Sequence, residues 1–352
     1  MLMGLPRAVF RSLAALCFST LPSFAQTLDW RQLPPVPDAL GLAAPFAGAS
    51  GGALLVAGGA NFPNGMPWEG GKKVWHDRVW VLDQPDGAWR EAGKLPRPLA
   101  YGVSVSTRDA VVCVGGSDAE RHYATVFRLT WKTGALRHES LPDLPIALAG
   151  AAGALVGDTL IVAGGAEQPG EQAATNRVFA LDLAAAKPTW RALPSLPGKS
   201  RMLAMAAAHE GGFYLFGGCA LEPKDDGKVG RVYLREAWRY REGAGWQRLG
   251  DLPKPNAAAP SPVPLMAGRL LLLAGDDGSL AGFTPVERHP GFPATILAYE
   301  PALDRWSEAG ETPAPRATVP CVEWRGAFVF PSGEVRPGVR SPEVWSLRPS
   351  RP

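Results

Sequence analysis

Short runs of apolar residues that end in paired glycines recur along this chain and predict the strands of β-sheets. The first run, Leu54–Ala57, has four consecutive apolar residues and is followed by Gly58-Gly59. Such a run is typical of a buried strand, and two glycines allow a tight turn that other residues resist. Beyond this turn, Arg78–Asp83 alternates outward and inward positions, which predicts a second strand. Trp89 falls on a third, short strand.

This pattern returns five more times with a period near fifty residues. The first positions of the six turns, which differ by 49 to 58 residues, are Gly58, Gly115, Gly164, Gly217, Gly275 and Ser332. The last two turns are degraded copies, Gly275-Asp276 and Ser332-Gly333. Most units also carry a Leu-Pro turn, a strand of small residues and a final strand with a tryptophan. Strand-length units at this period predict a kelch-type β-propeller.

The two ends of the chain complete one another. The sixth unit ends at Trp345–Leu347 without a fourth strand, and the segment Leu28–Pro35 has the pattern of that missing strand and its Leu-Pro turn. Pairing the ends closes the ring and hides strand edges that would otherwise aggregate. We therefore predict an all-β, six-bladed kelch-type β-propeller in which the N-terminal strand completes the last blade.

The first 25 residues have the pattern of a signal peptide. Arg7 and Arg11 form a basic region, Ser12–Leu21 is apolar, and Ser23-Phe24-Ala25 offers small residues for cleavage near Ala25. The apolar run is shorter than the ~18 residues that a membrane-spanning helix needs. We expect residues 1–25 to be removed, and residues 26–352 to form one soluble domain that is periplasmic or secreted, with no membrane partner.

Composition and charge exclude several other classes of function. The chain has 41 glycines and 35 prolines, but they fall at strand ends and so mark turns rather than disorder. The net charge of +3 argues neither for nor against an acidic partner, but no stripe of Lys and Arg stands out, which argues against nucleic-acid binding. Cys113, Cys219 and Cys321 are far apart and lie beside apolar runs, so buried free thiols are favoured over a disulfide. We expect no metal site and no cofactor, because the chain has no Cys-x-x-Cys or His-rich motif.

The repeat is broken most clearly by the loop Asn61–Asp77. At seventeen residues it is long for a turn, and long loops on a rigid scaffold are usually functional. It carries Glu69 next to Lys72 and Lys73. Glu69 is a candidate general base, although a glutamate beside two lysines also fits a solvated ion pair.

The corresponding loop of the last unit, residues 333–341, is the second break. Arg336 and Arg340 bracket Pro-Gly and could form a fork for a carboxylate or phosphate. Alternatively, either arginine pairs with Glu334 or Glu343.

A third break is a charge at the start of a strand of small residues. Only Arg201 and Arg316 occupy this kind of position, and we expect Arg201 to point toward the mouth of the central channel. One carboxylate and several arginines from different blades could then converge around a small anionic ligand.

In these elements the chain resembles the bacterial N-acetylneuraminate epimerases, or sialic acid mutarotases, and their cyclically permuted relatives. The resemblance is carried by Ala57–Phe62, Glu69–Lys73, Ala100–Ser104 and Gly333–Arg340, and Arg201 falls where the family has an arginine. The Glu-Gly-x-Lys-Lys unit lies near the family's C-terminus but comes first here, a permutation that a closed ring tolerates. One residue departs from the pattern, because the family's arginine before Ala-Tyr-Gly is Leu99 here. Either Arg97 reaches the same space, or the ligand differs from sialic acid.

The resemblance implies an enzyme that interconverts the anomers of N-acetylneuraminate or a related acidic sugar by acid/base catalysis, without a cofactor. It places the proton acceptor at Glu69. Trp68 and Trp75 could raise the pKa of this carboxylate by partial burial, while Lys72 and Lys73 would oppose that shift. The sugar's carboxylate would be held by Arg201, Arg336 and Arg340. Further substrate-binding candidates are Glu334, Asn61, Lys72, Lys73, Tyr101 and Arg97. His76 and Tyr101 are candidates for the general acid.

Two other functions are compatible with a propeller of this kind. A non-catalytic exported propeller would bind a glycan or a protein through the same loops and would be indifferent to Glu69. A copper radical oxidase would need a cluster of Tyr, Cys and two His. The five histidines of the chain show no such grouping in the sequence.

Overall fold

The computed structural model describes Met1 and residues 28–170, 173–225 and 227–350. The predicted signal peptide and its cleavage point lie outside the described residues. Within them, no helix is long and apolar enough to cross a membrane. The three cysteines Cys113, Cys219 and Cys321 are free.

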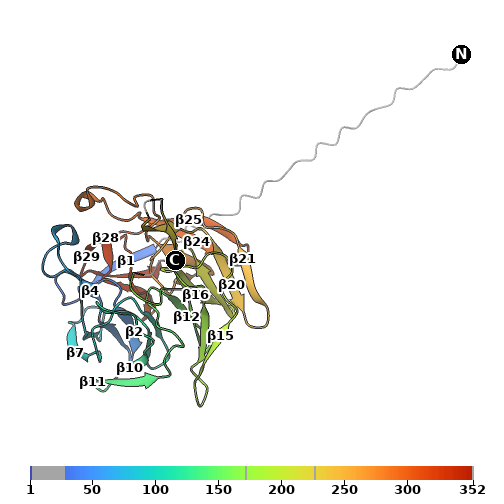
Figure 1. Ribbon diagram of the computed structural model, residues 1–352. Helices are drawn as coiled ribbons and strands as arrows, with labels where there is room; N and C mark the ends of the chain where they lie inside the picture. The colour runs from blue at the N-terminus through green and yellow to red at the C-terminus, as the bar shows by residue number, and fades with distance from the viewer. Residues whose placement is uncertain (2–27, 171–172, 226, 351–352) are drawn as a thin grey trace.

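The chain forms six four-stranded antiparallel sheets, the blades of a propeller (Figure 1). Blade 1 contains β2 (Phe46–Ser50), β3 (Ala53–Ala57), β6 (Arg78–Leu82) and β7 (Arg90–Lys94). Blade 2 contains β8 (Val103–Ser106), β9 (Val111–Val114), β10 (Val126–Lys132) and β11 (Ala135–Leu141). Blade 3 contains β12 (Ala152–Val156), β13 (Thr159–Ala163), β14 (Val178–Asp182) and β15 (Trp190–Leu193).

The second half of the chain repeats this plan. Blade 4 contains β16 (Met205–His209), β17 (Gly212–Phe216), β20 (Ala237–Arg241) and β21 (Gly245–Leu249). Blade 5 contains β22 (Leu265–Met266), β23 (Arg269–Leu273), β24 (Thr295–Glu300) and β25 (Arg305–Glu311). Blade 6 contains β26 (Val322–Trp324), β27 (Ala327–Pro331), β30 (Val344–Pro349) and β1 (Leu28–Leu33).

The two ends of the chain meet in blade 6, as predicted. Strand β1 pairs antiparallel with β30, with Leu28 opposite Pro349 and Leu33 opposite Val344. In Figure 1, β1 is blue and lies among the red strands of the C-terminal part. The six-bladed architecture and its closure by the N-terminal strand are therefore confirmed.

The apolar runs form the second strands, which are covered on both faces by neighbouring blades. All five residues of β3 and all five of β17 are buried. Tryptophans at the outer edges of blades 1, 3, 4 and 5 tie these blades to the preceding one; for example, Trp89 Nε1 donates to Pro34 O at 2.8 Å and Trp190 Nε1 to Pro142 O at 2.7 Å. Each such bond stabilises by about 1 kcal/mol, so the repeated Trp and Leu-Pro residues serve the scaffold.

The paired-glycine turns follow the second strands and need left-handed backbone. Gly58 has φ 66°, and a Cβ there would lie 2.2 Å from Leu99 O. The fifth turn differs from the prediction by one residue: it begins at Ala274, with φ 59°, and not at Gly275. Ala274 N donates to Thr295 O just as Gly58 N donates to Arg78 O, so Asp276 follows the turn instead of forming it.

A closed ring of backbone hydrogen bonds surrounds the central axis. One residue before each blade has a positive φ, and each donates its N–H to the carbonyl of the equivalent residue in the preceding linker at 2.7–3.0 Å. The six residues are Ala44, Tyr101, Gly150, Leu203, Ala258 and Thr318. This ring fixes the six linkers relative to one another.

Candidate functional site

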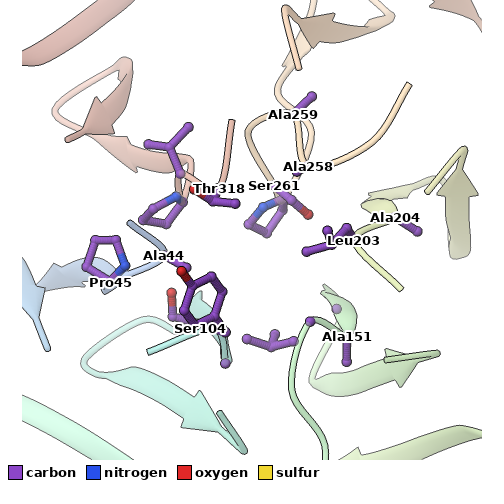
Figure 2. Close-up of a pocket in the computed structure, with 18 residues that line it drawn as sticks. Ala44, Pro45, Ser104, Ala151, Leu203, Ala204, Ala258, Ala259, Ser261 and Thr318 are labelled. Carbon is purple, nitrogen blue, oxygen red and sulfur yellow. The ribbon is translucent and has the colours of Figure 1, made fainter. Parts of the chain in front are cut away.

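A cavity of about 420 Å³ opens at one end of the propeller, above the ring of left-handed residues. Five of the six ring residues line both this cavity and a narrow channel of about 80 Å³ along the axis. Figure 2 shows this channel, where the labelled residues surrounding it are mostly small, such as Ala44, Ala258 and Ser261. The ring is therefore the floor of the wide cavity, and a sugar-sized ligand fits above it and not below it.

Three two-stranded hairpins rise around this cavity from blades 1, 4 and 6. They are β4–β5 (Ala60–Asn61 with Val74–Trp75), β18–β19 (Cys219–Pro223 with Val229–Tyr233) and β28–β29 (Glu334–Arg336 with Val339–Arg340). Because blades 6 and 1 are neighbours in the ring and blade 4 lies opposite blade 1, two hairpins share one wall and the third faces them.

Glu334 is the carboxylate of the shared wall. It follows the sixth turn, lines the cavity, and its side chain is 17% exposed. One carboxylate oxygen pairs with Arg340 Nη2 at 3.0 Å, and the other accepts a hydrogen bond from Thr318 Oγ1 at 3.2 Å. Because Thr318 belongs to the backbone ring, the carboxylate is held in one orientation above the floor.

Arg340 lies beneath Glu334 and is closed off from the cavity. Its side chain is 3% exposed, its Nε donates to Ala60 O at 3.3 Å, and its guanidinium lies 4.5 Å from the ring centre of Phe62. We expected Arg340 to hold the sugar's carboxylate, but that group would first have to displace Glu334. Arg340 instead joins blade 6 to blade 1 and orients Glu334.

Lys73 and Tyr101 form a second polar pair on the same side of the cavity, which both of them line. Lys73 Nζ donates to Tyr101 Oη at 3.1 Å and lies 4.9 Å from the Tyr101 ring centre, with Trp75 and Phe62 also nearby. Lys73 forms no ion pair with a carboxylate among the described residues. Two of its three N–H donors therefore stay available to a ligand.

Glu69, the predicted base, lies outside this cavity. It is the last residue of the short 3₁₀ helix η1 (Pro67–Glu69), its side chain is exposed, and its Oε2 accepts from Met66 N at 2.9 Å. The expected partial burial of Glu69 is therefore wrong. Lys72 is also exposed and does not line the cavity.

Arg201 does not point toward the mouth of the channel, and that prediction is wrong. Its side chain is fully buried, donates to Gly217 O at 3.0 Å and pairs with Glu236. Arg316 is placed in the same way, donating to Ser332 O and pairing with Glu343. Burial lowers the pKa of both arginines, and their glutamate partners oppose that shift.

Leu99 has the same position in the linker before blade 2 that Arg201 has in the linker before blade 4. Both accept a backbone hydrogen bond from the second residue of the preceding turn, Gly59 for Leu99 and Gly165 for Arg201. Leu99 is buried in a core cluster, so an apolar residue replaces a buried ion pair there. Arg97 does not reach this space, because it is exposed and stacks over Tyr123 with 4.6 Å to the ring centre.

The remaining candidates hold loops together. Asn61 is buried; its amide nitrogen donates to Asp38 Oδ1 at 3.1 Å and Gly41 O at 3.0 Å, and its Oδ1 bonds His76 Nε2 at 2.8 Å. These bonds make Nε2 of His76 a donor to Asn61, and neither residue lines the cavity. Arg336 donates to Glu287 O outside the cavity and lies 5.8 Å from the ring centre of Trp68.

Comparison with known proteins shows which family this architecture belongs to. The model of the N-acetylneuraminate epimerase family matches residues 20–137 and 141–280. The chain belongs to this family. It is 38% identical over 128 residues to the N-acetylneuraminate epimerase of Yersinia enterocolitica, 32% of each chain. The corresponding protein of Yersinia pestis is 38% identical over 131 residues, and that of Salmonella enteritidis 43% over 118 residues, 30% of each chain. These alignments span about a third of the relatives' length.

The family match includes Glu69, Lys73, Tyr101 and Arg201 but ends before the β28–β29 hairpin. The placement of Glu334 in the cavity therefore rests on the structure itself.

The wall formed by blades 4 and 5 carries polar residues that the sequence analysis missed. Asp276 accepts a hydrogen bond from Tyr233 Oη at 2.6 Å, and Arg231 lines the cavity beside them. Burial and the neighbouring Asp276 raise the pKa of Tyr233 above its usual range. The sequence did contain a signal for these residues. Asp276 and Glu334 both come directly after a paired turn, and Ser117 and Cys219, which have the same position in their blades, also line the cavity.

Among the described residues, no three His, Cys, Asp or Glu side chains are grouped so that they could hold a metal ion. Besides Glu334, the cavity is lined by the carboxylates of Asp118 and Asp276, by the Lys73–Tyr101 pair, by Arg231 and by His122. These are the groups of acid/base catalysis on an acidic ligand.

Proposed function

We propose that this chain is an exported mutarotase that interconverts the anomers of N-acetylneuraminate or a related acidic sugar, with Glu334 as the proton acceptor. The observation that carries the proposal is the Glu334 carboxylate, which is fixed by Arg340 and Thr318 while lining the cavity. Membership in the N-acetylneuraminate epimerase family supports the choice of substrate.

Mutarotation opens and recloses the hemiketal ring. Glu334 removes the proton of the anomeric hydroxyl, the oxygen's electron pair forms a carbonyl, and the bond from the anomeric carbon to the ring oxygen breaks. The ring oxygen takes a proton from an acid on the enzyme. After the carbonyl turns its other face to the freed hydroxyl, the reverse steps return both protons and restore both groups. An acid/base pair of this kind typically contributes ~10²–10⁴-fold to the rate.

Tyr101 is the proposed acid. Its hydroxyl accepts from Lys73 Nζ at 3.1 Å, so its own hydrogen is free to be donated to the ring oxygen. The positive charge of Lys73, 4.9 Å from the ring centre, stabilises the phenolate that remains. Tyr101 and Thr318 are separated in the backbone ring only by Ala44, which places the acid and the base on adjacent parts of the floor.

Lys73 is also the proposed partner of the sugar's carboxylate. In a 2-keto acid sugar the carboxylate and the anomeric hydroxyl are attached to the same carbon, so the cation that binds one must lie close to the base that serves the other. Lys73 belongs to blade 1, next to the blade of Glu334, and no carboxylate of the described chain competes for it. Holding both groups on one wall would orient the anomeric carbon toward Glu334.

The decisive experiment compares Glu334→Gln with Glu69→Gln. The rate of anomer interconversion of N-acetylneuraminate is followed by NMR for both variants and for the wild type. We expect Glu334→Gln to lose about 100-fold or more of the acceleration, because an amide cannot accept the proton, and Glu69→Gln to keep wild-type activity. The opposite pattern would return the base to Glu69. Saturable binding without acceleration by the wild type would show that the cavity is a lectin-like site.

Export is part of the proposal and rests on the basic and apolar pattern of residues 1–25. Fractionation of the native host, followed by N-terminal sequencing of the protein, tests it. A mature chain that begins near Gln26 in the periplasm or medium is expected, and an uncleaved cytoplasmic chain would contradict export.

A further inference from the structure

The β18–β19 hairpin of blade 4 faces the proposed catalytic wall from across the cavity. Arg231 and Tyr233 lie on the same face of β19, two residues apart, and Tyr233 is opposite Cys219 in the hairpin. Arg231, Tyr233 and Cys219 all line the cavity. The hairpin therefore turns one face, with one arginine on it, toward a bound ligand.

The guanidinium of Arg231 hydrogen-bonds the Tyr233 hydroxyl, and its five N–H donors leave others for a ligand. Asp276, the nearest carboxylate of that wall, is already bonded by Tyr233 Oη at 2.6 Å and by Gly278 N at 3.0 Å. Within the described chain Arg231 makes no ion pair, and it lines the cavity. Removal from water lowers its pKa, but Cys219, Tyr233 and Asp276 raise it further, so the group stays charged.

The same wall is held in place by close packing. A Cβ on Gly278 would lie 2.5 Å from the Tyr233 ring, so the loop after β23 is in direct contact with the hairpin. Met202 exchanges two backbone hydrogen bonds of 2.8 and 2.9 Å with Cys219, which ties the base of the hairpin to the floor. Arg231 is thus presented from a fixed support.

The floor next to this arginine is apolar. Leu203 belongs to the backbone ring, and the Met202 side chain packs over Gly150, 3.1 Å from where a Cβ would stand. Both Met202 and Leu203 line the cavity. A charged hydrogen-bond donor above an apolar floor fits a group with an acceptor oxygen at one end and a methyl group at the other.

We propose that this recess, formed by Arg231, Met202 and Leu203, binds the acylamino substituent of the sugar and makes the enzyme selective for N-acylated substrates. Arg231 donates to the acyl carbonyl oxygen, and the methyl group packs on Met202 and Leu203. The inference rests on the proposed function, which places the anomeric end of the sugar at Glu334 on the opposite wall. It adds a specificity residue that takes no part in the proton transfers.

The test compares two substrates in two proteins. N-acetylneuraminate and its analogue with a hydroxyl in place of the acetamido group share the carboxylate and the anomeric centre. Interconversion rates are measured for the wild type, for Arg231→Gln and for the control Arg191→Gln, which alters an arginine of the outer strand β15 that pairs with Glu242. We expect Arg231→Gln to lower kcat/KM for N-acetylneuraminate about 10- to 100-fold and to change the analogue less than 3-fold.

Equal losses for both substrates, or no loss for either, would overturn the inference. Saturation-transfer NMR provides a readout that does not need catalysis, because the acetyl methyl protons of bound sugar should receive the strongest saturation in the wild type and lose it in Arg231→Gln. If the wild type binds in this way but does not accelerate interconversion, the mutarotase proposal fails and the acyl recess stands. If the wild type binds neither sugar, the acyl recess fails.

Discussion

Replacing Arg201 by leucine should destabilise the propeller without changing the proposed binding of N-acetylneuraminate. In the wild type the fully buried guanidinium pairs with Glu236, whose side chain is 20% exposed, and donates to Gly217 O at 3.0 Å. Removing one member of a buried ion pair costs about 3–5 kcal/mol. Because Glu236 keeps some contact with water, we expect the lower end, about 3 kcal/mol, and a fall of roughly 5–10 °C in melting temperature.

Blade 2 shows which neutral pair of residues can replace the ion pair that this variant loses. In each blade the first residue of the paired turn donates its N–H to one carbonyl, and those partners include Thr125 in blade 2 and Glu236 in blade 4. At the position before blade 2, Leu99 is combined with Thr125. At the same position of their blades, Arg201 is combined with Glu236 and Arg316 with Glu343. Buried arginine thus occurs only opposite glutamate among these six described positions.

The double variant Arg201→Leu with Glu236→Thr copies the Leu99–Thr125 combination and should recover most of the lost stability. Urea unfolding followed by tryptophan fluorescence measures the stability of both variants, and NMR measures KM for N-acetylneuraminate in the folded proteins. A single variant as stable as the wild type would refute the structural role. A tenfold rise of KM in a stable double variant would show that Arg201 contacts the sugar after all.

Two further predictions concern the cavity and the thiols. Lys73→Met should raise KM for N-acetylneuraminate about 10- to 100-fold, and less for its methyl ester, because a charged hydrogen bond is lost. The control variant Lys72→Met, at the exposed neighbouring residue, should leave KM unchanged. Equal effects of the two variants would contradict the assignment of Lys73. Burial raises the pKa of Cys219 to about 11, and that of Cys113 and Cys321 further, so all three stay protonated at pH 8. Mass spectrometry should find no alkylation of them by iodoacetamide in the native protein and complete alkylation in urea.

The fold could be predicted from the sequence because its signals are local and repeated. Every turn needs left-handed backbone, which the glycines indicate. The incomplete last unit and the extra strand at the N-terminus predict the closure. The fifth turn was misplaced by one residue because Ala274 adopts φ 59° without a glycine to mark it. The turn is held by hydrogen bonds from Ala274 N to Thr295 O and from Gly275 N to Arg316 O, and these distant partners are not visible in the local sequence.

The site was predicted only in part, because side-chain direction depends on register. The linker residue Arg201 looked like a channel residue, yet Leu203, two positions later, belongs to the ring that faces the axis. Similarly, Glu69 and Glu334 lie in corresponding loops. The first ends a 3₁₀ turn in solvent, and the second follows a paired turn directly and so lies in the cavity. Lys73 and Tyr101, two of the substrate-binding candidates, line the cavity, and their role in binding stays a prediction.

The ring of six hydrogen bonds has an electrostatic consequence for the ligand. Each amide points along the circumference to the next carbonyl, so the six bond dipoles follow one another in a circle and largely cancel along the channel axis. Six backbone N–H groups that pointed into the channel would form a strong anion-binding site, as they do in open nests of N–H groups. Here each of the six N–H groups is already bonded to a carbonyl of the ring. In the proposed mutarotase, the charged side chains of the two facing walls would therefore orient the sugar.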